Sequence, residues 1–395
     1  MKRTINSTEK ISKLAKTLFL CSFALLYSCS TFKTKEPKSS LVPIGILDLS
    51  LNHKKPSVMI PGDPYVAPVL HKNKIITEQN EEWITCSEVS KNLSSVKNIW
   101  AFPNQRGGLS VSPFVIKSNV ILTFKSGLVI NVDMRNGRRI WSTQLPGSLI
   151  ERPIVSHNAH IFLASSNQRL YSLKLKDGSI KWVYKVGENK EAKIRTLNKP
   201  LFFRNNIYLG NNDGEIKSLK IESGSLNWSF KPQFSEDDNP FKDYMGEFFI
   251  LDQTLYASRY DGHVFALDIS KANKKQLKWH FKTDENITTS SYDSGRYFIG
   301  TNKGSVHAFD IKTGKDRWNK KSYFGKIAIS TIATGEKNTY ITGSRGDIFL
   351  LKGTEGLVQW HGNLSIPIFN PPIYFKGKLL FPGQEKSKLY IYLTS

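Results

Sequence analysis

The sequence has few cysteines, no adjacent cysteine pair and no convincing helical periodicity. Its 395 residues include three cysteines, Cys21, Cys29 and Cys86, which are too few for a disulfide framework. The apolar run at 17–27 is much shorter than the roughly 20 residues that a membrane-spanning helix needs. These absences argue against a disulfide-stapled fold, a redox function and a permanent transmembrane helix.

Acidic residues are scarce relative to basic ones. The chain has 56 Lys and Arg against 33 Asp and Glu, which gives a formal net charge of +23. A basic protein favours anionic partners, which include phospholipid headgroups, nucleic acid and acidic protein surfaces. Net charge alone does not distinguish among these partners, so the distinction depends on the compartment in which the protein resides.

The first 28 residues are typical of a signal peptide. A basic segment precedes the apolar run 17–27, as in the n-region and h-region of such signals. An exported protein meets little nucleic acid, so we expect none as a partner and favour anions near the membrane. Residues 29–43 and 52–64 are rich in Lys, Ser and Pro, which predicts a flexible tether and a linker.

Tryptophan recurs through the rest of the chain with a period of about 40 to 50 residues, which together with β-type composition indicates propeller blades rather than a helical solenoid. The recurring residues are Trp100, Trp141, Trp182, Trp228, Trp279, Trp318 and Trp360. Five of them follow a glycine by four positions: Gly137, Gly178, Gly224, Gly314 and Gly356. Pairs such as Asn-Gly and Asp-Gly supply the positive φ of tight hairpin turns. Each period therefore contains a hairpin that ends near its tryptophan.

A second hairpin precedes each of these, so that one unit has four strands. The leading hairpins are Ala67–Thr77, Ser112–Thr123, Arg152–Ala164, Lys199–Gly210, Phe248–Ser258, Ser290–Gly300, Thr331–Thr342 and Asn370–Pro382. The last unit lacks a fourth strand, and Ile44–Leu51 is the natural donor because a propeller closes its ring with a strand from the other end. We predict an all-β, eight-bladed propeller of four-stranded antiparallel blades over 44–395, or seven blades if Ile44–Leu51 belongs to the tether.

Leu26-Tyr27-Ser28-Cys29 resembles a bacterial lipobox. The resemblance implies that cleavage leaves a lipid-modified Cys29 as the first residue. Several acyl chains anchor a protein stably to a membrane, whereas one chain alone is marginal. Ser30 follows the cysteine, which by the same resemblance favours the outer membrane over the inner membrane. The alternative is an ordinary secreted protein in which Cys29 is incidental.

The order of Gly, apolar residues, Asp, a Gly turn and Trp resembles the quinoprotein-type (PQQ-like) propeller repeat over Tyr65–Ser395. With a lipobox in front, the chain resembles the BamB family of outer-membrane lipoproteins. The resemblance implies a scaffold without enzymatic activity, cofactor or metal, at the periplasmic face of the outer membrane. Its expected partners are a BamA-type barrel protein, other subunits of the assembly complex, unfolded outer-membrane proteins and, through the lipid, the membrane.

The same resemblance assigns partner-binding residues. The family's docking loop contains Leu-x-Leu-Arg before an x-Pro strand start, and Ile194 and Arg195 match its second leucine and its arginine, with Leu197 in the same segment. Ala192 replaces the first leucine. Asp243 fits one position of the family's acidic pair, and Met245 occupies the other. The alternative is that Arg195 belongs to a solvated basic loop.

Quinoprotein dehydrogenases use this repeat to hold pyrroloquinoline quinone and calcium, so the repeat alone is compatible with an enzyme. Many of them stack an adjacent-cysteine disulfide on the cofactor, and no such pair exists here. His157 and His160 flank a hairpin turn, and Asp133, Asp268 and Asp310 recur where aspartate satisfies turn amides. We therefore expect no enzyme, and keep as alternatives a quinoprotein enzyme and an envelope propeller that binds another protein, glycan or small ligand.

Overall fold

The computed structural model describes residues 41–48, 66–79, 82–91, 95–105, 107–146, 149–152, 154–188, 197–235, 239–271, 276–293, 295–318, 325–335, 338–352, 356–364, 367–375, 378–382 and 388–394. Every regular element within these ranges is a β-strand, and none of them holds a helix that is long and apolar enough to cross a membrane. The predicted signal peptide, Cys29 and the linker 52–64 lie outside the described residues.

The first four complete sheets follow the chain without crossovers. They contain β2 (Val69–His71), β3 (Lys74–Gln79), β4 (Trp83–Val89) and β5 (Val96–Pro103); β6 (Phe114–Ile116), β7 (Asn119–Thr123), β8 (Leu128–Asp133) and β9 (Arg139–Gln144); β10 (Val155–His157), β11 (His160–Ala164), β12 (Arg169–Lys174) and β13 (Ile180–Lys185); and β14 (Leu201–Phe203), β15 (Asn206–Gly210), β16 (Ile216–Lys220) and β17 (Leu226–Phe230).

The second half continues the pattern. Its sheets contain β18 (Phe249–Leu251), β19 (Thr254–Ser258), β20 (His263–Asp268) and β21 (Gln276–Lys282); β22 (Ile287–Asp293), β23 (Arg296–Thr301) and β24 (Val306–Asp310); β25 (Ile329–Gly335), β26 (Asn338–Gly343), β27 (Asp347–Lys352) and β28 (Leu357–Asn363); and β29 (Ile373–Phe375), β30 (Lys378–Pro382) and β31 (Lys388–Thr394) with β1 (Leu41–Asp48).

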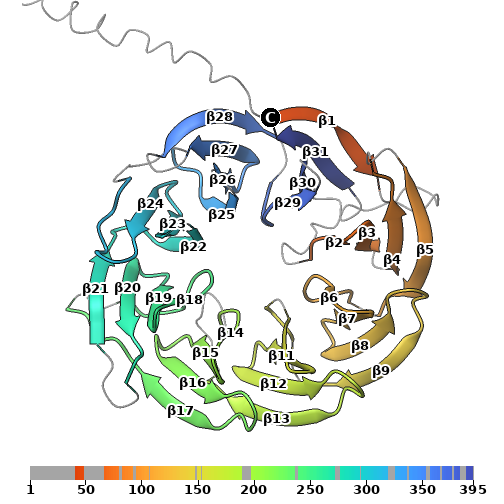
Figure 1. The fold of residues 1–395 in the computed structure, drawn as a ribbon, viewed down its shortest axis with the longest axis horizontal. Helices are drawn as coiled ribbons and strands as arrows, with labels where there is room; N and C mark the ends of the chain where they lie inside the picture. The colour runs from red at the N-terminus through yellow and green to blue at the C-terminus, as the bar shows by residue number, and fades with distance from the viewer. Residues whose placement is uncertain are drawn as a thin grey trace, which may run out of the picture. The chain divides into compact units, whose positions relative to one another are not determined.

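The sheets of residues 40–395 follow one another around a ring, with the first strand of each sheet nearest the centre and the last at the outside (Figure 1). All neighbouring strands within a sheet are antiparallel, so the predicted all-β propeller fold is confirmed. Seven sheets have four strands, and the sheet of β22–β24 has three among the described residues. The number of blades stays a prediction, because residues 319–324, which follow this sheet, lie outside the described part.

The two ends of the propeller pair in one sheet. β1 runs antiparallel to β31, with Leu41 opposite Thr394 and Asp48 opposite Lys388. This pairing covers the edge of β31 that would otherwise be open to other chains. Residues 49–51 of the segment Ile44–Leu51 lie outside the described residues, and the domain boundaries stay predictions.

The core lies between neighbouring sheets. The second strands of most sheets are buried on both sides, as in β7, where Ile121 on one side has no exposed surface and neither have Val120 and Leu122 on the other. These two side chains pack with Ile76 and Ile84 from the preceding sheet. Since each sheet is covered on both faces by its neighbours, its second strand is largely buried on both faces, whereas outer strands such as β9 and β13 hold mainly exposed and half-buried residues.

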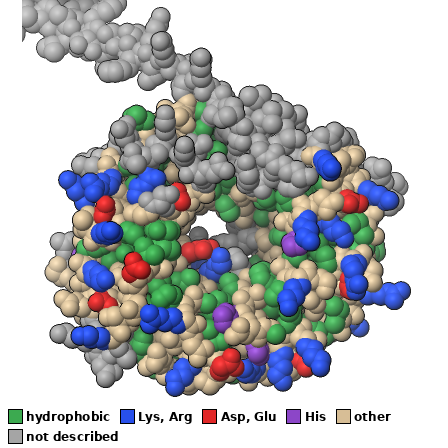
Figure 2. Space-filling model, viewed as in Figure 1, with side chains coloured by type: hydrophobic (Ala, Val, Ile, Leu, Met, Phe, Trp, Pro, Cys, Tyr) green, Lys and Arg blue, Asp and Glu red, His purple; other side chains and the backbone are tan. Residues whose placement is uncertain are grey.

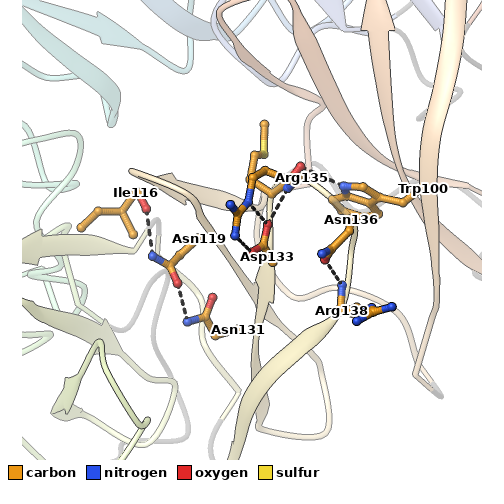
Figure 3. A network of polar contacts seen from close by, with 9 residues as sticks. Trp100, Ile116, Asn119, Asn131, Asp133, Arg135, Asn136 and Arg138 are labelled. Carbon is orange, nitrogen blue, oxygen red and sulfur yellow. Dashed lines mark hydrogen bonds and ion pairs between the residues drawn. The ribbon is translucent and has the colours of Figure 1, made fainter.

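Four outer-strand tryptophans contact the next sheet through the last turn of that sheet. The indole Nε1 donates to a backbone carbonyl there, as in Trp100 to Met134 at 3.0 Å and Trp141 to Leu175 at 2.8 Å. Trp182 and Trp279 make the same bond to Ile221 and Ile311. Figure 3 shows Trp100 beside the turn that carries Asp133 and Arg135. The spacing of tryptophans is therefore the spacing of contacts between sheets.

The turn glycines serve both the turn and this contact. Gly178 has a φ of +73°, as the hairpin prediction requires, and a Cβ built on it would lie 2.4 Å from the Trp141 ring. Gly224 and Gly356 meet Trp182 and Trp318 in the same way, at 2.5 and 2.6 Å. Glycine is thus required by the left-handed backbone and by the ring packed against it.

The recurring aspartates hold the same turns, as predicted. The carboxylate of Asp133 accepts from the backbone N–H of Arg135, and that of Asp310 from Lys312 and Thr313. The side-chain hydrogen bond from Arg135 lowers the pKa of Asp133 to about 2, and that from Arg317 lowers the pKa of Asp310 to about 2. These carboxylates are therefore structural anions at neutral pH.

We expect Gly178→Ala to reduce the free energy of unfolding by about 2–4 kcal/mol, because the methyl group meets Trp141 in addition to straining the backbone. Gly295→Ala is the matched control, since Gly295 has a φ of +79° but no atom within 4 Å of its Cβ position. Gly295→Ala should reduce the free energy of unfolding only through backbone strain, by about 1 kcal/mol. Urea unfolding measures both, and equal losses would show that the Trp contact contributes nothing.

The pH dependence of Asp310→Asn follows from its lowered pKa. A carboxyl with a depressed folded-state pKa stabilises the fold above its unfolded pKa, and this contribution is lost as the pH falls through the folded value. The stability difference between wild type and variant should be complete above about pH 4 and disappear towards about pH 2. Urea unfolding at several pH values tests this, with the exposed Asp284→Asn as control. A difference that stays constant across this range would contradict it.

Candidate partner-binding site

The strand order gives the ring two kinds of connection. Turns between the first two and the last two strands of each sheet lie at one end of the strands, and we call this end the turn face. The connections between second and third strands, and from one sheet to the next, lie at the other end, the loop face. The segments 186–200 and 231–248, which contain all the predicted partner-binding residues, both connect sheets and therefore belong to the loop face.

The segment 186–200 is fixed at both ends. Val186 is buried and its N–H donates to the carbonyl of Gln168 at 2.8 Å. Leu197 is 1% exposed and packs with Val186 and Ile207, while the Arg152 guanidinium donates to its carbonyl. Ile194 and Arg195, like Ala192, lie outside the described residues. The structure therefore places Leu197 in the core beneath the loop, where its side chain anchors the segment and is not available for a partner.

An ion pair joins this segment to the next connection on the loop face. The Lys199 Nζ lies 2.8 Å from the Glu247 carboxylate, and the backbones of the two residues form a parallel bridge. The pair is partly exposed, so its energetic contribution is small, but the backbone bridge sets the spacing of the two segments. Leu197 and Asp243 thus come from adjacent segments that this bridge connects.

Asp243 and Met245 point into the protein. Asp243 is 2% exposed, and its carbonyl accepts from the Tyr260 N–H at 2.8 Å. Met245 is also buried and packs with Tyr256 and Tyr297. In this chain Met245 is a core residue, and the carboxylate of Asp243 is not on the surface. Both side chains therefore lie in the protein interior beneath the loop face.

Beside Asp243 lies a buried charged pair that sequence reasoning missed. Arg259 and Asp261 form a two-pronged ion pair with side chains 0% and 1% exposed, through Nε to Oδ1 at 3.1 Å and Nη2 to Oδ2. The Arg259 guanidinium also lies 5.3 Å from the Phe234 ring centroid. The signal in the sequence was an Arg-x-Asp-Gly turn at a position where the neighbouring repeat has Asn-x-Asp-Gly.

Phe234 connects this pair to two histidines. Its ring stacks on His263 and His280, with centroid distances of 4.2 and 4.3 Å. The two imidazoles share a hydrogen bond between His263 Nδ1 and His280 Nε2 at 2.8 Å. The segment 231–248 is therefore held to the sheet of β18–β21 by aromatic stacking and by the polar groups under it.

The other residues that sequence reasoning considered for chemistry have structural surroundings. His157 and His160 pair across a two-residue turn, and His160 Nδ1 lies 2.7 Å from the Asn158 carbonyl. Burial raises the pKa of the Cys86 thiol to about 11, so this thiol is poorly nucleophilic at neutral pH. Within the described ranges no three His, Cys, Asp or Glu side chains gather where they could hold a metal ion. The arrangement on the loop face suits contact with a partner.

A known protein family matches most of the propeller. Residues 92–320 and 279–368 match the family described as outer membrane protein assembly factor BamB. The chain belongs to this family. The expected family resemblance is thereby confirmed, and with it the general role of a BamB-type propeller in assembly. Comparison with curated protein sequences gave no match.

Solved structures agree on the fold. BamB from Moraxella catarrhalis superimposes with a TM-score of 0.71 at 15% identity, covering 89% of this chain and 99% of that one. The quinohemoprotein alcohol dehydrogenase ADHIIG from Pseudomonas putida HK5 gives a TM-score of 0.66 at 10% identity, covering 92% and 78%. Sqt1 from Saccharomyces cerevisiae also gives 0.66 at 10% identity, covering 85% and 97%. At such identities these likenesses show the propeller fold alone.

Removing one member of the buried pair should be costly. Arg259→Met leaves the Asp261 carboxylate buried without its guanidinium, and we expect a loss of about 3–5 kcal/mol in the free energy of unfolding. Adding Asp261→Asn removes that charge and should restore part of the loss. Urea unfolding of the single and double variants measures the coupling, and a double variant less stable than Arg259→Met would refute this account.

Proposed function

We propose that the protein is a non-catalytic, lipid-anchored scaffold that serves the assembly of outer-membrane β-barrel proteins from the periplasmic face of the outer membrane. The observation that carries the proposal is the match of most of the propeller to the BamB family. The lipobox-like Leu26–Cys29 supports the anchor, with Cys29 as the lipidated residue.

The finer proposal is that the loop face docks on a BamA-type subunit. Ile194 and Arg195 provide the contact, as the resemblance implies, from a segment whose ends are held by Val186 and Leu197. An arginine beside apolar side chains has the composition of an interface hot spot. A loop held at both ends loses less conformational entropy on binding, which favours affinity.

The other predicted residues contribute indirectly. Leu197 keeps the segment on the core, and Asp243 holds the neighbouring turn through its carbonyl. The Lys199–Glu247 bridge sets the distance between the two segments. Unfolded outer-membrane proteins and other subunits of the assembly complex are the further partners of this scaffold.

The test is crosslinked affinity purification of the tagged protein from cell envelopes, followed by mass spectrometry. We expect wild type to recover a BamA-type barrel protein and Arg195→Glu to lose at least about 90% of it, because charge reversal at a hot spot costs more than 1.4 kcal/mol. Arg345→Glu is the matched control, since Arg345 is an exposed arginine on the loop face between β26 and β27. It should recover the barrel protein as wild type does.

Two outcomes would reject parts of this proposal. Recovery of the barrel protein by the wild type and by both variants would reject the role of Arg195 but keep the assembly role. Absence of every assembly subunit from the wild-type sample would reject the assembly role and favour an envelope propeller with a different partner.

A further inference from the structure

We propose that the turn face docks on a membrane surface of anionic phospholipids. The described turns of this face carry ten basic residues, all exposed, and three acidic ones. The basic residues are Lys72, Lys91, Lys117, Arg135, Arg138, Lys176, Arg204, Lys271, Lys312 and Lys315, and the acidic ones are Asp177, Glu222 and Asp252. These basic residues are distributed over the six sheets from β2 to β24 rather than gathered in one patch.

The loop face does not share this excess. Its described connections carry nine basic and ten acidic residues, and two of each, Arg152 with Arg259 and Asp243 with Asp261, are buried. The basic ones are Lys125, Arg152, Lys199, Lys231, Lys242, Arg259, Lys303, Lys326 and Arg345, and the acidic ones are Glu82, Glu151, Glu188, Asp213, Glu215, Asp243, Glu247, Asp261, Asp284 and Glu285. Within the described connections, the two ends of the propeller thus differ strongly in charge, although they are built from the same repeat.

Nearby carboxylates offset only part of the charge on the turn face. Asp133, Asp268 and Asp310, at the ends of third strands, are half-buried and accept from backbone N–H groups of the turns. Arg135 pairs with Asp133, but Lys117 and Lys312 form no ion pair with a described residue. On the face drawn in Figure 2, Lys and Arg side chains plainly outnumber Asp and Glu.

Apolar side chains border the turn face at the outside of the ring. Ile180, Leu226 and Leu357 are the first residues of their outer strands, and so lie next to the turns, with 41%, 46% and 50% of their surface exposed. Ile140 occupies the second position of β9 and is 48% exposed. Basic residues beside exposed Leu and Ile are typical of surfaces that lie in the headgroup region of a membrane.

The course of the chain brings this face to the membrane. Leu41 lies opposite Thr394, the last residue of the third strand of its sheet, so β1 begins at the turn face. Cys29 precedes Leu41 by twelve residues, which span at most about 40 Å when fully extended. This step rests on the proposed lipidation of Cys29. A lipid there keeps the turn face close to the bilayer and leaves the loop face for protein partners.

The experiment measures lysine accessibility in the full-length protein purified from envelopes. The protein is added to phosphatidylcholine vesicles with or without phosphatidylglycerol and treated with a membrane-impermeant amine reagent, and labelling is read by mass spectrometry. On anionic vesicles, labelling of Lys117, Lys176 and Lys312 should fall at least about threefold, because basic residues near anionic headgroups are attracted within a Debye length. Lys231, Lys303 and Lys326 on the loop face should be unchanged.

Charge-reversal variants provide the matched control. In Lys117→Glu/Lys176→Glu/Lys312→Glu, the remaining turn-face residues Lys72 and Lys315 should lose their protection. In Lys231→Glu/Lys303→Glu/Lys326→Glu, which changes the net charge equally, they should keep it. About 0.5 M salt should also remove the protection, since the Debye length is then below about 5 Å.

Failure of this proposal and failure of the proposed anchor give different results. Flotation of the protein with pure phosphatidylcholine vesicles depends only on the lipid attached to the protein. A protein that does not float with these vesicles would reject lipidation of Cys29. Protection of the turn-face lysines on anionic vesicles needs no lipid on the protein, so it reports on binding by the turn face. Equal labelling on both kinds of vesicle, equal protection of both faces, or protection that appears only in native envelopes and points to an acidic protein would each overturn the proposal.

Discussion

The contact between a tryptophan of one sheet and the turn glycine of the next is the constraint on which the rest of this propeller depends. The indole ring covers a turn that only glycine can form without a clash, and its N–H donates to a carbonyl of the same turn. A twisted four-stranded sheet cannot bury both of its faces alone, so each sheet relies on its neighbours. The repeated contact sets the distance and angle between sheets and thereby closes the chain into a ring.

A rigid ring lets its two ends serve different tasks. The loop face carries long connections that are held by buried side chains such as Leu197 and Asp243 and by the Arg259–Asp261 pair. These groups keep exposed segments in place without themselves meeting a partner. The turn face has short, hydrogen-bonded turns, and among their described exposed charged residues Lys and Arg prevail. The connections between strands thus carry the proposed contacts, while the repeated strands maintain the fold.

Much of the fold could be predicted because its signals are local. Turn glycines, the aspartates beside them and alternating apolar residues act within a few positions, and the structure places them as expected in hairpins. The site was less predictable, since burial is decided by residues distant in sequence. Leu197 lies in a basic loop segment and Asp243 follows an acidic insertion, which suggested exposure, yet both are packed against neighbouring strands. Nothing local distinguishes a carboxylate on the surface from one beneath a loop.

The sequence by itself determined the all-β repeat, the positions of its turns and its family, because each rests on backbone preferences and spacing along the chain. Only the tertiary structure decided that Gly178 packs under Trp141, that Lys199 joins Glu247 across two sheets and that basic turns gather at one end of the ring. These are consequences of packing between sheets, which brings together residues that are distant in the sequence. Local preferences select the strands, and packing between sheets selects which side chains meet.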